Sequence, residues 1–348
     1  VIMANILILG AGSMGAAFSV PCSDNNHNVT IIGTHLENEF IDKINLSKIH
    51  PSLDCKIPKN VSFKKYENFM HAIKKEIDLI VVAVSSKGIE WASNLLSENL
   101  VKTIPILILT KGLAINNNNY EILAHKMQRI IQTKGIKELN ISAAGGPCLA
   151  KGLANRIHTS VIFANKDVNV VKKIAKLVST NYYHISTSDD VVGVEICAAI
   201  KNIFSMIIGA SEGLCLSSNL KESSKKNFLN TAAALLQQSI YEMIIFTEKL
   251  HGKKETVIGL AGIGDLYVSA DGGRNSKMGK FLGQGMSYKK AKKEKMNNDT
   301  VEGADLIMEI GSKVKNDHDP KELPLMISMI DTICNSKPLT VNWKNFKL

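Results

Sequence analysis

Short, nearly continuous apolar runs alternate with helical patterns through the first half of the chain. Parallel strands that helices cover on both faces have this pattern. The pattern therefore predicts a doubly wound α/β domain of the Rossmann type. Five buried strands are expected, and two more follow them: Asn5–Leu9, Val29–Ile32, Leu79–Val84, Ile106–Thr110 and Leu139–Ala143, then His158–Ala164 and Tyr182–Thr187.

The periodicity changes near residue 188. From Asp189 onward strand patterns end, and long helical patterns continue to about residue 335. This predicts an α/β domain at 1–188 and an all-helical domain at 189–348. Asn116–Asn119 is expected to form a surface turn, and Lys221–Lys226 a solvated connection.

Composition narrows the class of protein. The 348 residues are 45% hydrophobic and 21% charged, as in ordinary globular proteins. No apolar run is expected to reach the ~18–20 residues of a membrane span, and Asn5–Leu9 is too short for a signal-peptide core, which favours a cytoplasmic protein. The six scattered cysteines include no CxxC pair, so we expect reduced thiols and no metal site.

A net charge of +10 raises the question of a nucleic-acid partner. The densest basic run, residues 289–295 (KKAKKEK), contains no aromatic residue for base stacking. We therefore expect a solvated helix face there and no nucleic-acid partner. The surplus of positive charge would favour small anionic substrates.

A glycine-rich loop, Gly10-Ala-Gly12-Ser-Met-Gly15, follows the first strand directly and opens a helix. In this context the spacing is typical of dinucleotide binding, because the glycines permit the turn, the approach of a pyrophosphate and close helix–strand packing. Pro21 falls inside the helix and is expected to kink or shorten it.

In NAD-binding domains of this type, an Asp or Glu at the end of the second strand usually binds the adenine ribose hydroxyls and decides the choice of cofactor. Here the sequence continues through Thr34 with no acid before Glu37 and no basic residue to hold a 2′-phosphate. This argues against strict NAD specificity and leaves NAD and NADP both open.

Lys201 is the only cation between Val192 and Ala210, a stretch that is apolar on nearly every side of a helix. Its ammonium can reach a polar rim, as buried lysines often do. Alternatively it stays buried, where desolvation would lower its pKa and suit it to proton transfer.

Further candidate residues follow predicted strands or glycine-rich turns. Lys111 and Gly146 follow the fourth and fifth strands, at the sheet edge where α/β proteins bind ligands. Three glycines precede Asp265, and Arg274 with Asn275 introduces a predicted helix at Ser276–Leu282. A guanidinium, an amide and helix N–H groups together would form a phosphate site. Surface-loop positions are the alternative for Lys111 and Arg274.

In this order, GAGSMG, TKG, GGPCLA, GVEICAAIKNI, GLAGIGD, GRN and VEG resemble NAD(P)-dependent glycerol-3-phosphate dehydrogenases of the bacterial soluble type. The resemblance extends from residue 10 to 303. It implies a Rossmann domain, a helical domain like the C-terminal one of 6-phosphogluconate dehydrogenase, a homodimer, and a role in phospholipid synthesis. The implied reaction interconverts sn-glycerol 3-phosphate and dihydroxyacetone phosphate with NAD or NADP.

The resemblance also implies roles for single residues. Lys201 matches the proton-transferring lysine, with Lys111 and Asp265 beside it in the reaction. The implied cofactor contacts are Gly10, Gly12, Ser13, Met14, Gly15, Thr34, Lys111, Ala150, Arg274 and Glu302. The implied substrate contacts are Lys111, Gly146, Cys148, Lys201, Asp265, Gly273, Arg274 and Asn275.

Several positions depart from the family pattern. Cys148 and Gly273 each replace a hydroxyl residue, Gln238 replaces an arginine, and about ten extra residues surround Lys221–Leu229. These changes leave open a related reductase for another polyol phosphate or a small keto acid, as in ketopantoate reductase. A non-catalytic dinucleotide-sensing or nucleic-acid-binding module is a third reading, and it would leave the site lysine idle.

Overall fold

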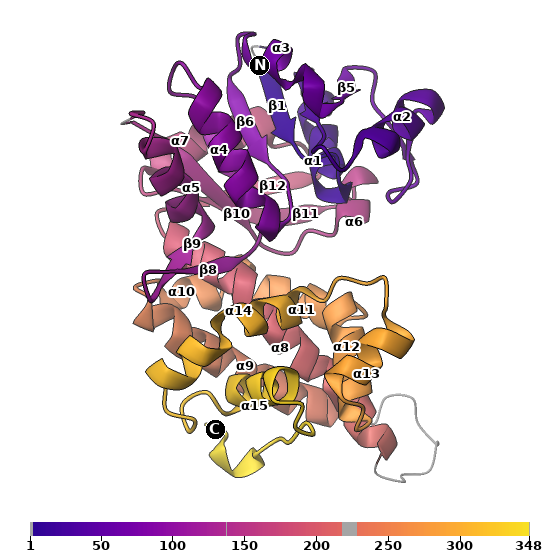
Figure 1. Ribbon diagram of the computed structural model, residues 1–348, viewed down its shortest axis with the longest axis vertical. Helices are drawn as coiled ribbons and strands as arrows, with labels where there is room; N and C mark the ends of the chain where they lie inside the picture. The colour runs from indigo at the N-terminus through magenta and orange to yellow at the C-terminus, as the bar shows by residue number, and fades with distance from the viewer. Residues whose placement is uncertain (1–2, 137, 218–227, 348) are drawn as a thin grey trace. The chain divides into compact units, whose positions relative to one another are not determined.

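The computed structural model describes residues 3–136, 138–217 and 228–347. Its contacts divide the chain into two compact units (Figure 1). One comprises Val1–Lys111 with Ile122–Glu195, and the other comprises Gly112–Glu121 with Ile196–Leu348. The expected connection at Lys221–Lys226 and most of the expected insertion at Lys221–Leu229 lie outside the described residues.

The first unit is built on an eight-stranded sheet with the order β12-β11-β10-β7-β6-β1-β2-β5. Six of these strands, from β5 to β10, pair in parallel in the order of a dinucleotide-binding sheet. β11 runs antiparallel to β10, and β12 extends the sheet parallel to β11. The strands are β1 (Asn5–Leu9), β2 (Asn28–Ile32), β5 (Val61–Lys64), β6 (Leu79–Val82), β7 (Ile106–Ile108), β10 (Ile141–Gly145), β11 (Thr159–Ala164) and β12 (Tyr183–Ser188).

All seven predicted strands occur, and their ends differ by a few residues. β5 was not predicted, because this edge strand of four residues alternates buried and less buried positions and has no continuous apolar run. The two-stranded hairpin β3 (Ile49–His50) and β4 (Cys55–Lys56) was not predicted either. β5 pairs with β2 at the edge of the large sheet, whereas β3 and β4 form a separate two-stranded sheet.

Helices cover the sheet on its two faces (Figure 1). α1, α6 and α7 bury residues in one cluster with Ile6 and Ile8 of β1, while α4 and α5 pack against each other. Pro21 neither ends nor visibly shortens α1, which continues to Asp24. The helices and helical turns are α1 (Ser13–Asp24), α2 (Asn38–Ser47), η1 (Tyr66–Asn68), α3 (Phe69–Ile73), η2 (Ser86–Gly88), α4 (Ile89–Asn99), α5 (Leu123–Gln132), α6 (Ala150–Ala154) and α7 (Val168–Val178).

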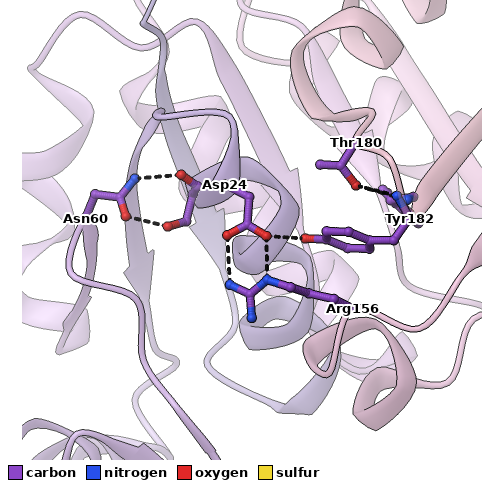
Figure 2. A network of polar contacts seen from close by, with 7 residues as sticks. Asp24, Asn60, Arg156, Thr180 and Tyr182 are labelled. Carbon is purple, nitrogen blue, oxygen red and sulfur yellow. Dashed lines mark hydrogen bonds and ion pairs between the residues drawn. The ribbon is translucent and has the colours of Figure 1, made fainter.

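A polar network joins the C-terminal end of α1 to the loops before β11 and β12. Figure 2 shows Arg156 donating to both carboxylate oxygens of Asp24, at 2.7 and 2.8 Å, and the Tyr182 hydroxyl donating to the same carboxylate at 2.6 Å. Burial tends to raise the pKa of Asp24, but these hydrogen bonds outweigh it and hold the pKa below its ordinary value. The network therefore stabilises the fold only while Asp24 is ionised.

The second unit consists of helices and one hairpin. The hairpin, β8 (Leu113–Asn116) and β9 (Asn119–Ile122), turns through Asn117 and Asn118, both at positive φ, so the predicted turn is confirmed and its strands were missed. Tyr120 packs edge-on against Phe246 at 5.3 Å, which fixes the hairpin to the helices. The helical elements are α8 (Val191–Ser217), α9 (Leu229–Lys249), α10 (Lys254–Val257), η3 (Leu260–Gly264), α11 (Asp265–Ala270), α12 (Arg274–Gly283), α13 (Tyr288–Lys295), α14 (Glu302–Asp317), α15 (Pro324–Cys334) and η4 (Trp343–Asn345).

The helix α8 is the apolar centre of this part of the chain. By length and composition alone its Val191–Leu216 segment could cross a membrane, contrary to the expectation that no run would be long enough. However, 89% of its most apolar window is buried inside the protein, as in the core helix of a soluble protein, so this one helix is weak evidence for a span. The basic run in α13 forms the expected solvated face, where only Ala291 is buried.

Helices α8 and α12 approach each other at glycines. A Cβ on Gly279 of α12 would lie 1.7 Å from the carbonyl oxygen of Met206, and one on Gly209 of α8 would lie 2.3 Å from that of Ser276. These distances leave no room for a side chain, so the two backbones are in direct contact. The contact fixes the start of α12 against α8.

Replacing Gly279 with alanine should separate these helices. The added methyl group meets backbone, which cannot move as a flexible side chain can, so we expect Gly279→Ala to lower the free energy of unfolding by at least about 2 kcal/mol. Gly152→Ala is the control, since its nearest atoms would be 3.9 Å away. Equal denaturation midpoints for the two variants would contradict the close contact.

Asp24 should contribute stability that depends on pH. Its pKa is lowered in the folded state, so the contribution is present above the unfolded-state pKa of about 4 and is lost as the pH falls through the folded value. We expect Asp24→Asn to lower stability by about 1 kcal/mol at pH 7 and by less at pH 3. Urea unfolding at both pH values measures this, with the exposed Glu98→Gln as control. A loss that is the same at both pH values would contradict the assignment.

Candidate functional site

The glycine loop after β1 has the shape that a dinucleotide needs. Gly10 has φ +108°, and a Cβ there would lie 2.7 Å from the Ala83 carbonyl oxygen. A Cβ on Gly15 would lie 2.4 Å from the Gly10 carbonyl oxygen, so the helix can pack this closely only with glycine. No side chain caps α1, which begins at Ser13, and its first N–H groups remain available to an anion. The loop therefore fits a pyrophosphate.

Two side chains hold the Ala11 peptide of this loop. Glu37 Oε2 accepts from the Ala11 N–H at 3.3 Å and from the Thr34 N–H at 2.7 Å. His50 Nε2 lies 3.2 Å from the Ala11 carbonyl oxygen and therefore carries the donated hydrogen. Burial lowers the pKa of His50, which favours this neutral form. Neither contact was predicted, because both depend on chain folding between β2 and β5.

The other predicted residues of the first unit follow its strands. Lys111 comes three residues after β7, and Gly146 comes directly after β10 with φ +111°. Cys148 and Ala150 are partly buried against the same core as Met14. These positions agree with a ligand-binding edge at the carboxyl ends of the strands.

Lys201 does not extend to a rim. Its side chain is 9% exposed, and its Nζ donates to Asp265 Oδ1 and to Ser269 Oγ, both at 2.5 Å. Asp265 is itself buried, with 3% of its side chain exposed. Sequence reasoning identified the ion pair's two residues, but it missed Ser269, one turn along the helix from Asp265. The ammonium is therefore buried, paired and oriented.

An irregular turn places Asp265. The glycine-rich segment Leu260–Gly264 forms a π-helical turn, η3, closed by the Gly264 N–H to the Gly259 carbonyl oxygen at 3.2 Å. A Cβ on Gly262 would lie 1.9 Å from the Val257 carbonyl oxygen, so the turn requires glycine there. Such turns occur frequently at functional sites. Here the turn sets Asp265 at the first residue of α11, opposite Lys201.

A second polar group joins α8, α12 and α14. Asn275 donates from Nδ2 to Asn202 Oδ1 at 3.1 Å and accepts at its own Oδ1 from the Gly303 N–H at 2.9 Å. Arg274 pairs with Glu302, and its side chain is 54% exposed. Asn202 directly follows Lys201 on α8, so one helix carries a residue of each polar group.

The arrangement limits what each predicted residue can contact. The Asn275 amide contacts protein groups at both of its atoms, so it positions α12 against α8 and α14. Its predicted contact with substrate stays a prediction. Among the described residues, Arg274 has no side-chain partner besides Glu302, which leaves guanidinium N–H groups available. The helix α12 begins at Arg274, after Gly273, without a side-chain cap. Arg274 and the start of α12 therefore both retain N–H donors of the kind that bind anions.

Gln238, one of the positions that depart from the family pattern, contacts the C-terminal segment. Gln238 donates from Nε2 to Glu242 Oε1 at 3.0 Å and accepts from the Lys347 N–H at 2.9 Å, so it fixes the C-terminal segment. Within the described ranges, no group of three or more His, Cys, Asp or Glu side chains could hold a metal ion.

Comparison with known proteins agrees with this geometry. Residues 5–171 match the family described as NAD-dependent glycerol-3-phosphate dehydrogenase N-terminus, and residues 190–341 match its C-terminus. The chain is 30% identical to the NADP(+)-dependent glycerol-3-phosphate dehydrogenase of Archaeoglobus fulgidus, over 83% of each chain. It is 31% identical to the glycerol-3-phosphate dehydrogenase [NAD(P)+] of Francisella tularensis, over 86% of this chain and 84% of the relative.

Solved structures share the fold. The glycerol-3-phosphate dehydrogenase of Coxiella burnetii superposes with a TM-score of 0.80 at 22% identity, covering 97% of this chain and 96% of that one. The Plasmodium falciparum enzyme gives a TM-score of 0.83 at 19% identity, covering 99% and 96%. With both family domains matched in order, the chain belongs to the NAD-dependent glycerol-3-phosphate dehydrogenase family.

Proposed function

We propose that the protein interconverts sn-glycerol 3-phosphate and dihydroxyacetone phosphate, with NAD or NADP as the hydride carrier. The observation that carries the proposal is the buried contact of Lys201 with Asp265 and Ser269. A buried, oriented ammonium suits the protonation of a ketone oxygen during its reduction.

The proton is supplied by Lys201. Reduction adds a hydride to the C2 carbon and a proton to the C2 oxygen, and the bound cofactor would provide the hydride. Lys201 Nζ donates the proton as charge develops on that oxygen, and it accepts the proton in the reverse direction. Asp265 and Ser269 keep Nζ in place, and Asp265 offsets the cost of burying the charge.

The substrate phosphate binds at the start of α12. The free guanidinium N–H groups of Arg274 and the helix N–H groups after Gly273 supply donors and positive potential. Binding energy from the phosphate then positions the carbonyl at Lys201. Glu302 orients Arg274 through their ion pair.

Residues 1–188 would hold the cofactor and 189–348 the substrate. Gly10, Gly12, Ser13, Met14 and Gly15 would surround the pyrophosphate, with Thr34 toward the adenosine and Ala150, Arg274 and Glu302 as further contacts. Lys111, Gly146 and Cys148 would contribute from the first domain to substrate binding. We further propose a cytoplasmic homodimer that provides glycerol phosphate for phospholipid synthesis.

Lys201→Ala tests the chemistry. Loss of the proton donor should lower kcat for reduction of dihydroxyacetone phosphate by at least about a hundredfold while cofactor affinity stays unchanged. Lys280→Ala, which removes an exposed ion pair with Glu212, is the control. The assignment of Lys201 is wrong if the variant retains most of its turnover.

Arg274→Ala tests the substrate class. With the cofactor saturating, we expect kcat/KM for dihydroxyacetone phosphate to fall by about a hundredfold, because charged hydrogen bonds to phosphate are lost, while turnover of dihydroxyacetone, which lacks the phosphate, should be unaffected. A screen of ketones with and without a phosphate provides the measurement. Equal losses on both classes, or a preference of the wild type for an unphosphorylated keto acid, would contradict the proposed phosphate site.

A further inference from the structure

The carboxylate of Glu37 connects the end of β2 to the glycine loop. Its Oε2 accepts from the Thr34 N–H at 2.7 Å, just after β2, and from the Ala11 N–H at 3.3 Å, inside the loop. Counting residues along the chain had placed this acid too far beyond the strand to matter. The chain turns back at Thr34, where the Glu37 N–H bonds to the Thr34 carbonyl oxygen at 3.0 Å, so the acid returns to the strand end.

Glu37 retains capacity to bind a ligand. Its Oε1 has no hydrogen-bond partner among the residues that the structure describes, and the side chain is only partly buried. In a dinucleotide-binding sheet the adenine ribose lies at the end of β2, beyond the loop that holds the pyrophosphate. A carboxylate oxygen there accepts from ribose hydroxyls, whereas a 2′-phosphate would meet a like charge.

The surroundings offer little to offset that charge. Lys65 is paired with Asp42 at 2.7 Å, and Lys64 is exposed on the neighbouring strand β5, opposite Ile32 of β2. No ion pair to Glu37 occurs within the described part of the chain. The centroid of the His35 ring lies 6.2 Å from that of Trp91, so the residues after this end of β2 include an aromatic pair and no arginine that could bind a 2′-phosphate.

We propose that Glu37 makes this protein select NAD(H) over NADP(H). Oε1 accepts hydrogen bonds from the adenine ribose hydroxyls, and the carboxylate disfavours a phosphate at the 2′ position. The inference rests on the proposed function only in that a nicotinamide dinucleotide binds at the loop. It specifies a preference that the family resemblance leaves open.

The test is calorimetric titration of the full chain with NADH and with NADPH, without substrate. We expect the wild type to bind NADH at least about tenfold more tightly than NADPH. Glu37→Gln removes the charge but keeps an oxygen acceptor for the two N–H groups, so the loop should persist. The ratio of the two dissociation constants should then fall by at least about tenfold, chiefly through tighter NADPH binding.

Controls separate selectivity from loop support. Glu39→Gln changes an exposed acid in the first turn of the same helix and should leave both affinities unchanged. If Glu37→Gln weakens the binding of NADH and NADPH by the same factor, Glu37 only stabilises the loop and the inference fails. It also fails if the wild type binds NADPH as tightly as NADH or more tightly. If neither dinucleotide binds the wild type, the proposed function itself fails.

Discussion

A lysine ammonium remains charged inside a protein only where a partner offsets its lost hydration, because an isolated buried charge costs several kcal/mol. Lys201 has such partners in Asp265 and Ser269, both at 2.5 Å. The helical unit is organised around this contact. The π turn before Asp265 needs Gly262, and the backbone contact of α12 with α8 needs Gly279 and Gly209. These three glycines therefore set the positions of Asp265 and of the start of α12 relative to α8.

At the start of α12, Arg274 and Asn275 make different contacts. Arg274 and Asn275 are neighbours, and both were expected to contact substrate. Asn275 bonds to Asn202 and to the start of α14, whereas the Arg274 guanidinium bonds only to Glu302 among the described residues. Asn275 therefore sets the position of α12, and in the proposed anion site Arg274 and the helix N–H groups are the donors. Glu302 connects the two, since its carboxylate contacts both side chains.

The sequence was informative where local patterns decide structure. Buried parallel strands show as apolar runs, and the glycines of the loop after β1 and before Asp265 are local requirements of the backbone, so these features were predictable. Ser269, Glu37 and His50 were missed because their roles depend on contacts across 68, 26 and 39 residues. The short edge strand β5 lacks a continuous apolar run, and the hairpin of residues 112–121 packs with helices far along the chain. Tertiary contacts, not local propensity, decide such cases.

The central claim is that Lys201 donates the proton and that Asp265 keeps it charged. The most direct measurement is the pH dependence of kcat for reduction of dihydroxyacetone phosphate, in the wild type and in Asp265→Asn. Because the donor must be protonated, the rate should fall as the pH rises, and removing the carboxylate charge should move that decline to lower pH by about one unit or more. A decline at the same pH in both proteins would show that the titrating donor is not the ammonium paired with Asp265.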